Sequence, residues 1–79
     1  MFKNKNEDGT FNISGKNIIL LRKELKFSQR KLADKMQLIG IDLSKNAIQQ
    51  IESGERFVTD IELKAFASFF KISADDLLK

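Results

Sequence analysis

The sequence contains no cysteine, no histidine and no proline among its 79 residues. The lack of cysteine and histidine excludes thiol chemistry, zinc sites built from these ligands, and catalytic pairs in which histidine is the base. The longest uncharged apolar run, residues 18–21, is far too short to span a bilayer. We therefore expect no metal, no cofactor and no membrane-spanning segment, and the absence of cysteine and of a signal-like start fits the reducing cytoplasm.

The composition allows one small domain with a single core. Hydrophobic residues make up 42% of the chain and include seven phenylalanines, so a core can form without disulfides or metals. The net charge is +3, but residues 16–35 alone carry seven Lys or Arg and only two acids. Such a basic region suits docking onto a polyanion, whereas the same lysines on a solvated helix surface need no partner. Charge alone leaves both interpretations open.

The first thirteen residues differ from the rest because they are polar and rich in asparagine. Their apolar residues, Phe2 among them, are able to pin a short hairpin onto the body, but isolated hairpins are only marginally stable. We predict a flexible N-terminal arm over residues 1–13 and a folded domain over residues 14–79. Lys3 and Lys5 in this arm are candidates for phosphate contacts if the domain binds a nucleic acid.

Five later segments carry apolar residues at helical spacing, each preceded by a Ser or Thr of the kind that caps helices. The predicted caps are Ser14, Ser28, Ser44, Thr59 and Ser73, of which the last two begin capping boxes. The first helix is expected to run to about Lys26. Gly40 and Gly54 are placed to end the second and third helices. Five short helices with tight links predict an all-α orthogonal bundle.

The apolar stripes of these segments define the predicted core. The residues expected to face it are Ile18, Leu21, Leu25, Leu32, Ala33, Met36, Ala47, Ile48, Ile51, Leu63, Phe66, Ala67 and Phe70. On the third helix this leaves a polar face of Lys45, Asn46, Gln49 and Gln50. Long or forked hydrogen-bonding groups of this kind can read base edges in a DNA groove, although on an isolated helix they would simply face solvent.

The ordered set of these residues resembles the phage-repressor and Cro-like (XRE-type) helix-turn-helix proteins. The matching pieces are Ile18-x-x-Leu21-Arg22, Ser28-Gln29-x-x-Leu32-Ala33, Ile48-x-x-Ile51-Glu52-x-Gly54-x-Arg56, and Ile72-Ser73-x-Asp75-x-Leu77-Leu78. Together they cover roughly residues 16–79 in the family's order. The resemblance implies a compact, lambda-repressor-like domain of five helices that usually acts as a dimer on a two-fold operator, with its third helix in the major groove.

The resemblance also implies roles for single residues. Base contacts would come from the third helix, through Lys45, Asn46, Gln49 and Gln50. Phosphate contacts would come from residues at the ends of the second and third helices, namely Gln29, Ser44 and Arg56. A structural ion pair between the first and third helices would join Arg22 to Glu52.

Two regions leave room for alternatives. From Met36 to Ser44 the chain spends about five residues more than the family's shortest turns, so the second helix is a turn longer or the connection bulges. The apolar Ile39, Ile41 and Leu43 favour a packed turn. Phe69 and Leu78 suit a dimer interface if they are exposed; otherwise they belong to the domain's own core.

We expect a sequence-specific regulator of transcription of bacterial or phage type, and a repressor that occupies an operator. Its partners would be double-stranded DNA and a second copy of the chain, with no membrane and no small-molecule ligand. The alternative is a protein-interaction module, such as an antitoxin whose main partner is another protein. An enzyme is far less consistent with the sequence, because the adjacent carboxylates Asp75 and Asp76 belong to a helix cap with no nucleophile in view.

Overall fold

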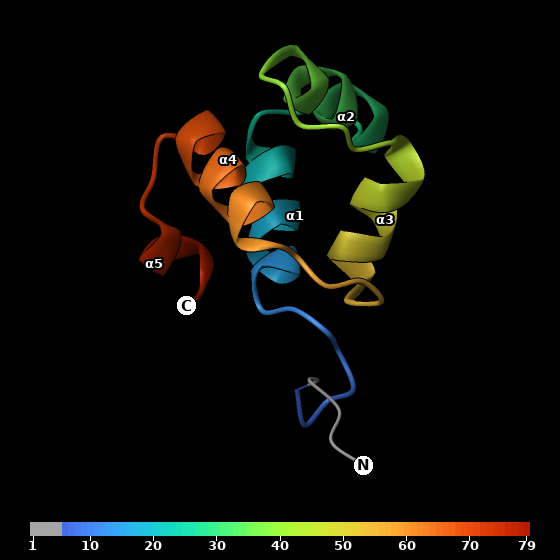
Figure 1. The fold of residues 1–79 in the computed structure, drawn as a ribbon, viewed down its shortest axis with the longest axis vertical. Helices are drawn as coiled ribbons and strands as arrows, with labels where there is room; N and C mark the ends of the chain where they lie inside the picture. Colours follow the sequence, from blue (N-terminus) through green and yellow to red (C-terminus); the bar gives the residue numbers. More distant parts are fainter. Residues whose placement is uncertain (1–5) are drawn as a thin grey trace.

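The computed structural model describes residues 6–79, which form five α-helices (Figure 1). The helices are α1 (Ser14–Glu24), α2 (Gln29–Leu38), α3 (Lys45–Ser53), α4 (Asp60–Phe70) and α5 (Ala74–Leu77). No strand occurs within this described range, so the expected all-α bundle of five helices is confirmed. The predicted anchor Phe2 and the predicted phosphate contacts Lys3 and Lys5 lie outside the described residues.

No helix in residues 6–79 combines the length and the apolar character that a membrane crossing requires.

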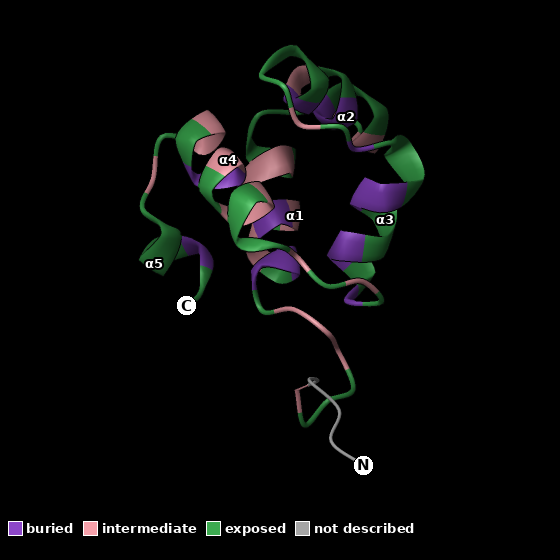
Figure 2. Cartoon of the chain, viewed as in Figure 1, coloured by how far each residue is buried: buried purple, intermediate pink, exposed green. Residues whose placement is uncertain are grey.

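The core receives buried side chains from every helix (Figure 2). Its members are Ile18, Leu32, Ala33, Met36, Leu43, Ala47, Ile48, Ile51, Phe66, Ala67 and Leu77. Leu21, Leu63 and Phe70, which were expected to face inward, are half-buried against this cluster. α3 packs against both α1 and α2 through its apolar side. The apolar stripe of α3 is therefore fixed on two sides, which decides the direction of its polar face.

Four of the five predicted caps form. The hydroxyls of Ser28 and Ser44 accept from the backbone N–H three residues on, and Thr59 and Ser73 complete capping boxes with acidic side chains. Hydrogen bonds from the side chain of Lys79 and from Ser73 hold the pKa of the exposed Asp76, the acid of the second box, below its ordinary value. These caps were predictable because donor and acceptor lie within three residues of each other.

The start and end of α1 differ from the prediction. Ser14 is not the cap but a buried first residue of the helix, and the Asn12 side chain accepts from the backbone N–H of Gly15 at 2.8 Å instead. At the other end α1 stops at Glu24, and Lys26 adopts a left-handed conformation with φ of 59°. The chain turns there toward α2, which leaves Leu25 48% exposed, so its predicted place in the core is wrong.

The connection between α2 and α3 is a turn held together by its own hydrogen bonds. Gly40 has φ of 89° and donates to the Gln37 carbonyl, and the N–H of Ile41 donates to the Met36 carbonyl, the pattern of a Schellman motif. The Gln37 side chain donates to the carbonyl of Leu43, whose own side chain is fully buried. The additional residues thus pack as a turn, although Ile39, expected to help fill it, is 50% exposed.

Candidate nucleic-acid interface

The polar face of α3 consists of side chains that point to solvent. Lys45, Asn46, Gln49 and Gln50 are all exposed, whereas Ala47, Ile48 and Ile51 on the opposite side are buried. Figure 1 places α3 at one edge of the bundle, on the side away from α5. Within residues 6–79 none of these four side chains forms a hydrogen bond or ion pair with another group. Their donors and acceptors are therefore available to a partner.

The N-terminus of α3 adds backbone donors to this face. The Ser44 hydroxyl accepts from the backbone N–H of Ala47 at 3.1 Å, and Ser44 itself is exposed. The N–H groups of the first helical residues have no partner within the helix, and the helix dipole makes this end attractive to anions. Ser44 thus lies at the end of α3 that favours anions.

A buried ion pair connects α1 to α3. Arg22 Nε lies 2.7 Å from Glu52 Oε2, and Arg22 Nη2 lies 3.1 Å from Glu52 Oε1. The two side chains are only 12% and 5% exposed. Arg22 Nη1 also donates to the Phe27 carbonyl at 2.7 Å, in the link between α1 and α2. A bidentate pair with this little solvent holds the two helices in one relative orientation.

Gln29, at the start of α2, joins the same network. Its Nε2 donates to Glu52 Oε1 at 3.0 Å. The start of α2 therefore lies beside the C-terminal half of α3. The amide of Gln29 has two N–H groups and this bond uses one of them, so the half-buried side chain retains a donor for a phosphate oxygen.

Arg56 lies in the loop that follows α3 and forms a different ion pair. Its Nη2 lies 3.0 Å from Glu62 Oε2, and the other oxygen of the same carboxylate caps α4. The Arg56 side chain is 35% exposed, so the guanidinium still reaches solvent. The structure brings Arg22, Glu52 and Gln29 together, and it places Arg56 and Ser44 separately at the two ends of α3. Contacts of all these residues with DNA stay predictions.

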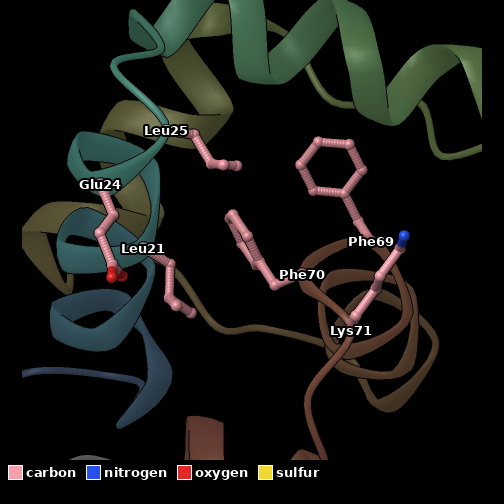
Figure 3. A pocket seen from close by; sticks show the side chains of 6 residues that line it. All are labelled: Leu21, Glu24, Leu25, Phe69, Phe70 and Lys71. Carbon is pink, nitrogen blue, oxygen red and sulfur yellow. The ribbon is translucent and has the colours of Figure 1, made fainter.

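The two residues proposed for a dimer interface have different surroundings. Phe69 is half-buried, with ring centroids 5.1 Å from Phe70 and 6.3 Å from Phe27. It lines a groove of about 430 Å³ between α1 and α4 (Figure 3). Leu78 follows α5 and is 43% exposed. Neither is part of the fully buried core.

Asn12 is the residue near this interface that sequence reasoning missed. Besides capping α1, its Nδ2 donates to the carbonyls of Ile51 and Arg56. Asparagine is among the best N-cap residues, and this preference was the one signal in the sequence that pointed to it. Its two long-range bonds have no counterpart in local sequence pattern.

Comparison with known proteins gives a match at the family level. A family model described as helix-turn-helix matches residues 18–77, which is most of the chain. Searches of curated proteins and of solved structures give no significant match.

Proposed function

Because the chain belongs to the XRE-type, Cro/repressor-like helix-turn-helix family and is thus a DNA-binding regulator, we propose that it represses transcription by occupying a specific operator. Bound at such an operator, the protein excludes the polymerase from the same stretch of double-stranded DNA. The site of action is then the compartment that holds the DNA, the cytoplasm of a bacterial cell.

The observation that carries this proposal is the exposed polar face of α3, whose side chains have no hydrogen-bond partner within residues 6–79. An α-helix with its side chains is about 10–12 Å across, so α3 fits into the major groove, which is about 12 Å wide. Asn46, Gln49 and Gln50 are residue types that pair with adenine through two hydrogen bonds, and Lys45 reaches guanine acceptors or phosphate. These four side chains are the proposed base contacts.

Groups at both ends of α3 support the proposed phosphate contacts. Ser44 and the free N–H groups stand at its N-terminal end, and Gln29 and Arg56 stand near its C-terminal end. Phosphate contacts at the two ends of a recognition helix fix its depth and register in the groove. The division into phosphate contacts at the ends and base contacts between them follows from this placement.

A second function, that of a protein-interaction module, is favoured by two apolar grooves that meet at Phe69. One is the groove between α1 and α4, and another of about 360 Å³ is lined by Ile39, Ile61 and Ala65 among others. Exposed apolar surface of this kind suits a protein partner. The two grooves fit a second copy of the chain, as the operator proposal requires, or a different protein if the domain is mainly an interaction module.

Selection of duplexes from a random pool, followed by titration at several salt concentrations, tests the proposal. We expect one preferred sequence with two related half-sites. If a dimer contacts about six phosphates, the logarithm of the binding constant falls with the logarithm of salt concentration with a slope of about −5. A chain that prefers no duplex but co-purifies with another protein would instead establish the interaction module.

A further inference from the structure

The side chain of Asn12 joins the start of α1 to the end of α3 and to the loop that follows α3. Its Oδ1 accepts from the Gly15 backbone N–H at 2.8 Å, at the start of α1. Its Nδ2 donates to the Ile51 carbonyl at 3.0 Å, in α3, and to the Arg56 carbonyl at 2.8 Å, in the following loop. Both N–H groups of the amide and its oxygen are therefore engaged.

The backbone around Asn12 lies directly against the end of α3. Phe11 donates its backbone N–H to the Gly54 carbonyl at 2.8 Å. At Gly54, where φ is 83°, an added Cβ would collide with the side chain of Thr10, and at Gly15 it would collide with the Ile51 carbonyl. Such close approach of backbones leaves little freedom for α3 to shift relative to the start of α1.

Residues before Asn12 hold it in place. Asn6 Nδ2 donates to the Asn12 carbonyl at 2.9 Å and to the Thr10 hydroxyl at 2.8 Å. The hydroxyl and backbone N–H of Thr10 donate in turn to Asp8 Oδ1 at 2.7 and 3.0 Å. Residues 6–12 thus form a hydrogen-bonded segment that presents Asn12 to the interior, where it is half-buried.

We propose that Asn12 is a positioning residue for DNA binding. Its side chain orients the last turn of α3 and the loop that carries Arg56. This inference rests on the proposed operator-binding function. Gly54 ends α3 in a left-handed conformation, and the chain reverses immediately after it. Asn12 bonds to a carbonyl on each side of that reversal, so it fixes the direction in which Arg56 leaves the helix.

The consequence for binding concerns contacts at one end of α3. The last turns of α3 carry the proposed base contact Gln50, and the loop carries the proposed phosphate contact Arg56. The Arg56 guanidinium is held by Glu62, and its main chain by Asn12. Without Asn12 the domain keeps its buried core, but this end of the interface loses its fixed geometry, and a displacement of about 1 Å is enough to weaken hydrogen bonds to bases.

Asn17 offers a matched control for the test. Its Nδ2 also donates to two main-chain carbonyls, those of Leu77 at 2.8 Å and Lys79 at 3.1 Å. It therefore ties α1 to the C-terminal end of the described chain with the same chemistry, and its side chain forms no hydrogen bond with α3. Serine is also a good N-cap residue, so Asn12→Ser can retain the cap of α1 while it removes the amide N–H groups that reach α3 and the loop. Neither Asn12→Ser nor Asn17→Ser changes the charge of the domain.

The experiment measures binding of full-length wild type, Asn12→Ser and Asn17→Ser to the preferred duplex and to a half-site duplex, at a temperature where each is fully folded by circular dichroism. We expect Asn12→Ser to bind the half-site about tenfold more weakly, as after the loss of one good base or phosphate contact. Its salt slope should be shallower by about one per copy, because a phosphate contact is lost. Asn17→Ser should match wild type in both readings.

The possible outcomes distinguish failure of the positioning role from failure of the proposed function. If Asn12→Ser is folded and binds the half-site with wild-type affinity and salt slope, the positioning role is wrong. If both variants weaken binding equally, Asn12 acts only through general stability, and the inference is again overturned. If wild type prefers no duplex, the proposed function itself fails. If Asn12→Ser is unfolded, Asn6→Ala takes its place, because it removes only the hydrogen bonds to the Asn12 carbonyl and to Thr10. We expect Asn6→Ala to lose less half-site affinity than a folded Asn12→Ser would. Wild-type half-site binding by Asn6→Ala would then refute the positioning role.

Discussion

At the scale of single residues, the Arg22–Glu52 pair combines a structural role with a place beside the proposed DNA surface. Charges this well shielded from water gain stability only if every lone pair and N–H finds a partner. Here Glu52 receives Arg22 and Gln29, and Arg22 also reaches the Phe27 carbonyl. No buried side-chain nitrogen or oxygen within the described residues lacks a hydrogen-bond partner. The network is therefore complete, and it is sensitive to the loss of any member.

Arg22→Ala should lower the free energy of unfolding by about 3–5 kcal/mol, because Glu52 stays buried without its cation. Lys23→Ala, at the next and exposed position, should change it by no more than about 0.5 kcal/mol. Urea unfolding with an unchanged m-value measures both. Equal midpoints for the two variants would contradict the assignment. The double variant Arg22→Ala with Glu52→Ala should recover part of the loss, because no unpaired carboxylate remains.

The fate of single residues also shows what sequence could reveal about the site. The Arg22–Glu52 pair was expected from the family resemblance, and the two groups do lie within hydrogen-bonding distance. The partner of Arg56, by contrast, depends on how the loop after Gly54 bends toward α4. The bonds of Asn12 to Ile51 and Arg56 span 39 and 44 residues. No local pattern specifies contacts of that range, which arise only when the helices are packed.

At the scale of elements, the helix boundaries that depend on local capping match the prediction. The helix boundaries that depend on packing against other helices do not. α2, α3, α4 and α5 begin next to their predicted caps, because each cap bonds to a backbone N–H within its own first turn. α1 departs at both ends: Asn12 replaces Ser14 as the capping side chain, and the chain leaves the helix before Leu25 can turn inward. Both differences follow from contacts with α3 and from the link to α2.

The turn between α2 and α3 decides how securely α3 presents its polar face. The Schellman hydrogen bonds at Gly40 and Ile41, together with the buried Leu43, anchor the turn to the core. Leu38 and Ile39, where α2 ends, are 80% and 50% exposed and add nothing to this anchor. Because the turn is anchored through Gly40, Ile41 and Leu43, α3 starts from a fixed point at Ser44.

Gln50→Ala and Arg56→Ala should affect DNA binding in different ways, because Gln50 lies in α3 and Arg56 lies in the loop that follows it. Gln50 is on the exposed face of α3, so its loss should relax the preference at one base position by about 1–3 kcal/mol. Arg56 follows the helix, so its loss should weaken all duplexes alike and reduce the salt slope by about one. Titration of the preferred duplex and its single-base variants separates the two. The same uniform loss in both variants would show that the division of roles is wrong.

At the scale of the whole molecule, the base contacts proposed for one copy of the domain are too few to select an operator. The proposed base contacts come from four side chains on one helix of nine residues. Each good base contact contributes about 1–3 kcal/mol of discrimination, and a genome offers about 10⁶ or more competing sites. A two-fold dimer doubles the number of contacts and places two recognition helices one DNA turn apart, about 34 Å. This requirement supports the proposed homodimer, with Phe69 and Leu78 as its candidate interface.

Leu78→Gln tests this interface without disturbing the core, because Leu78 is 43% exposed. We expect the variant to dimerise more weakly in sedimentation equilibrium and to bind a two-half-site duplex with less cooperativity, while its affinity for a single half-site is unchanged. Leu38→Gln is the matched control, since Leu38 is 80% exposed and is the last residue of α2. It should dimerise as wild type does. A wild-type chain that stays monomeric at high concentration and binds the two half-sites independently would refute the dimer, and equal dimerisation of both variants would remove Leu78 from the interface.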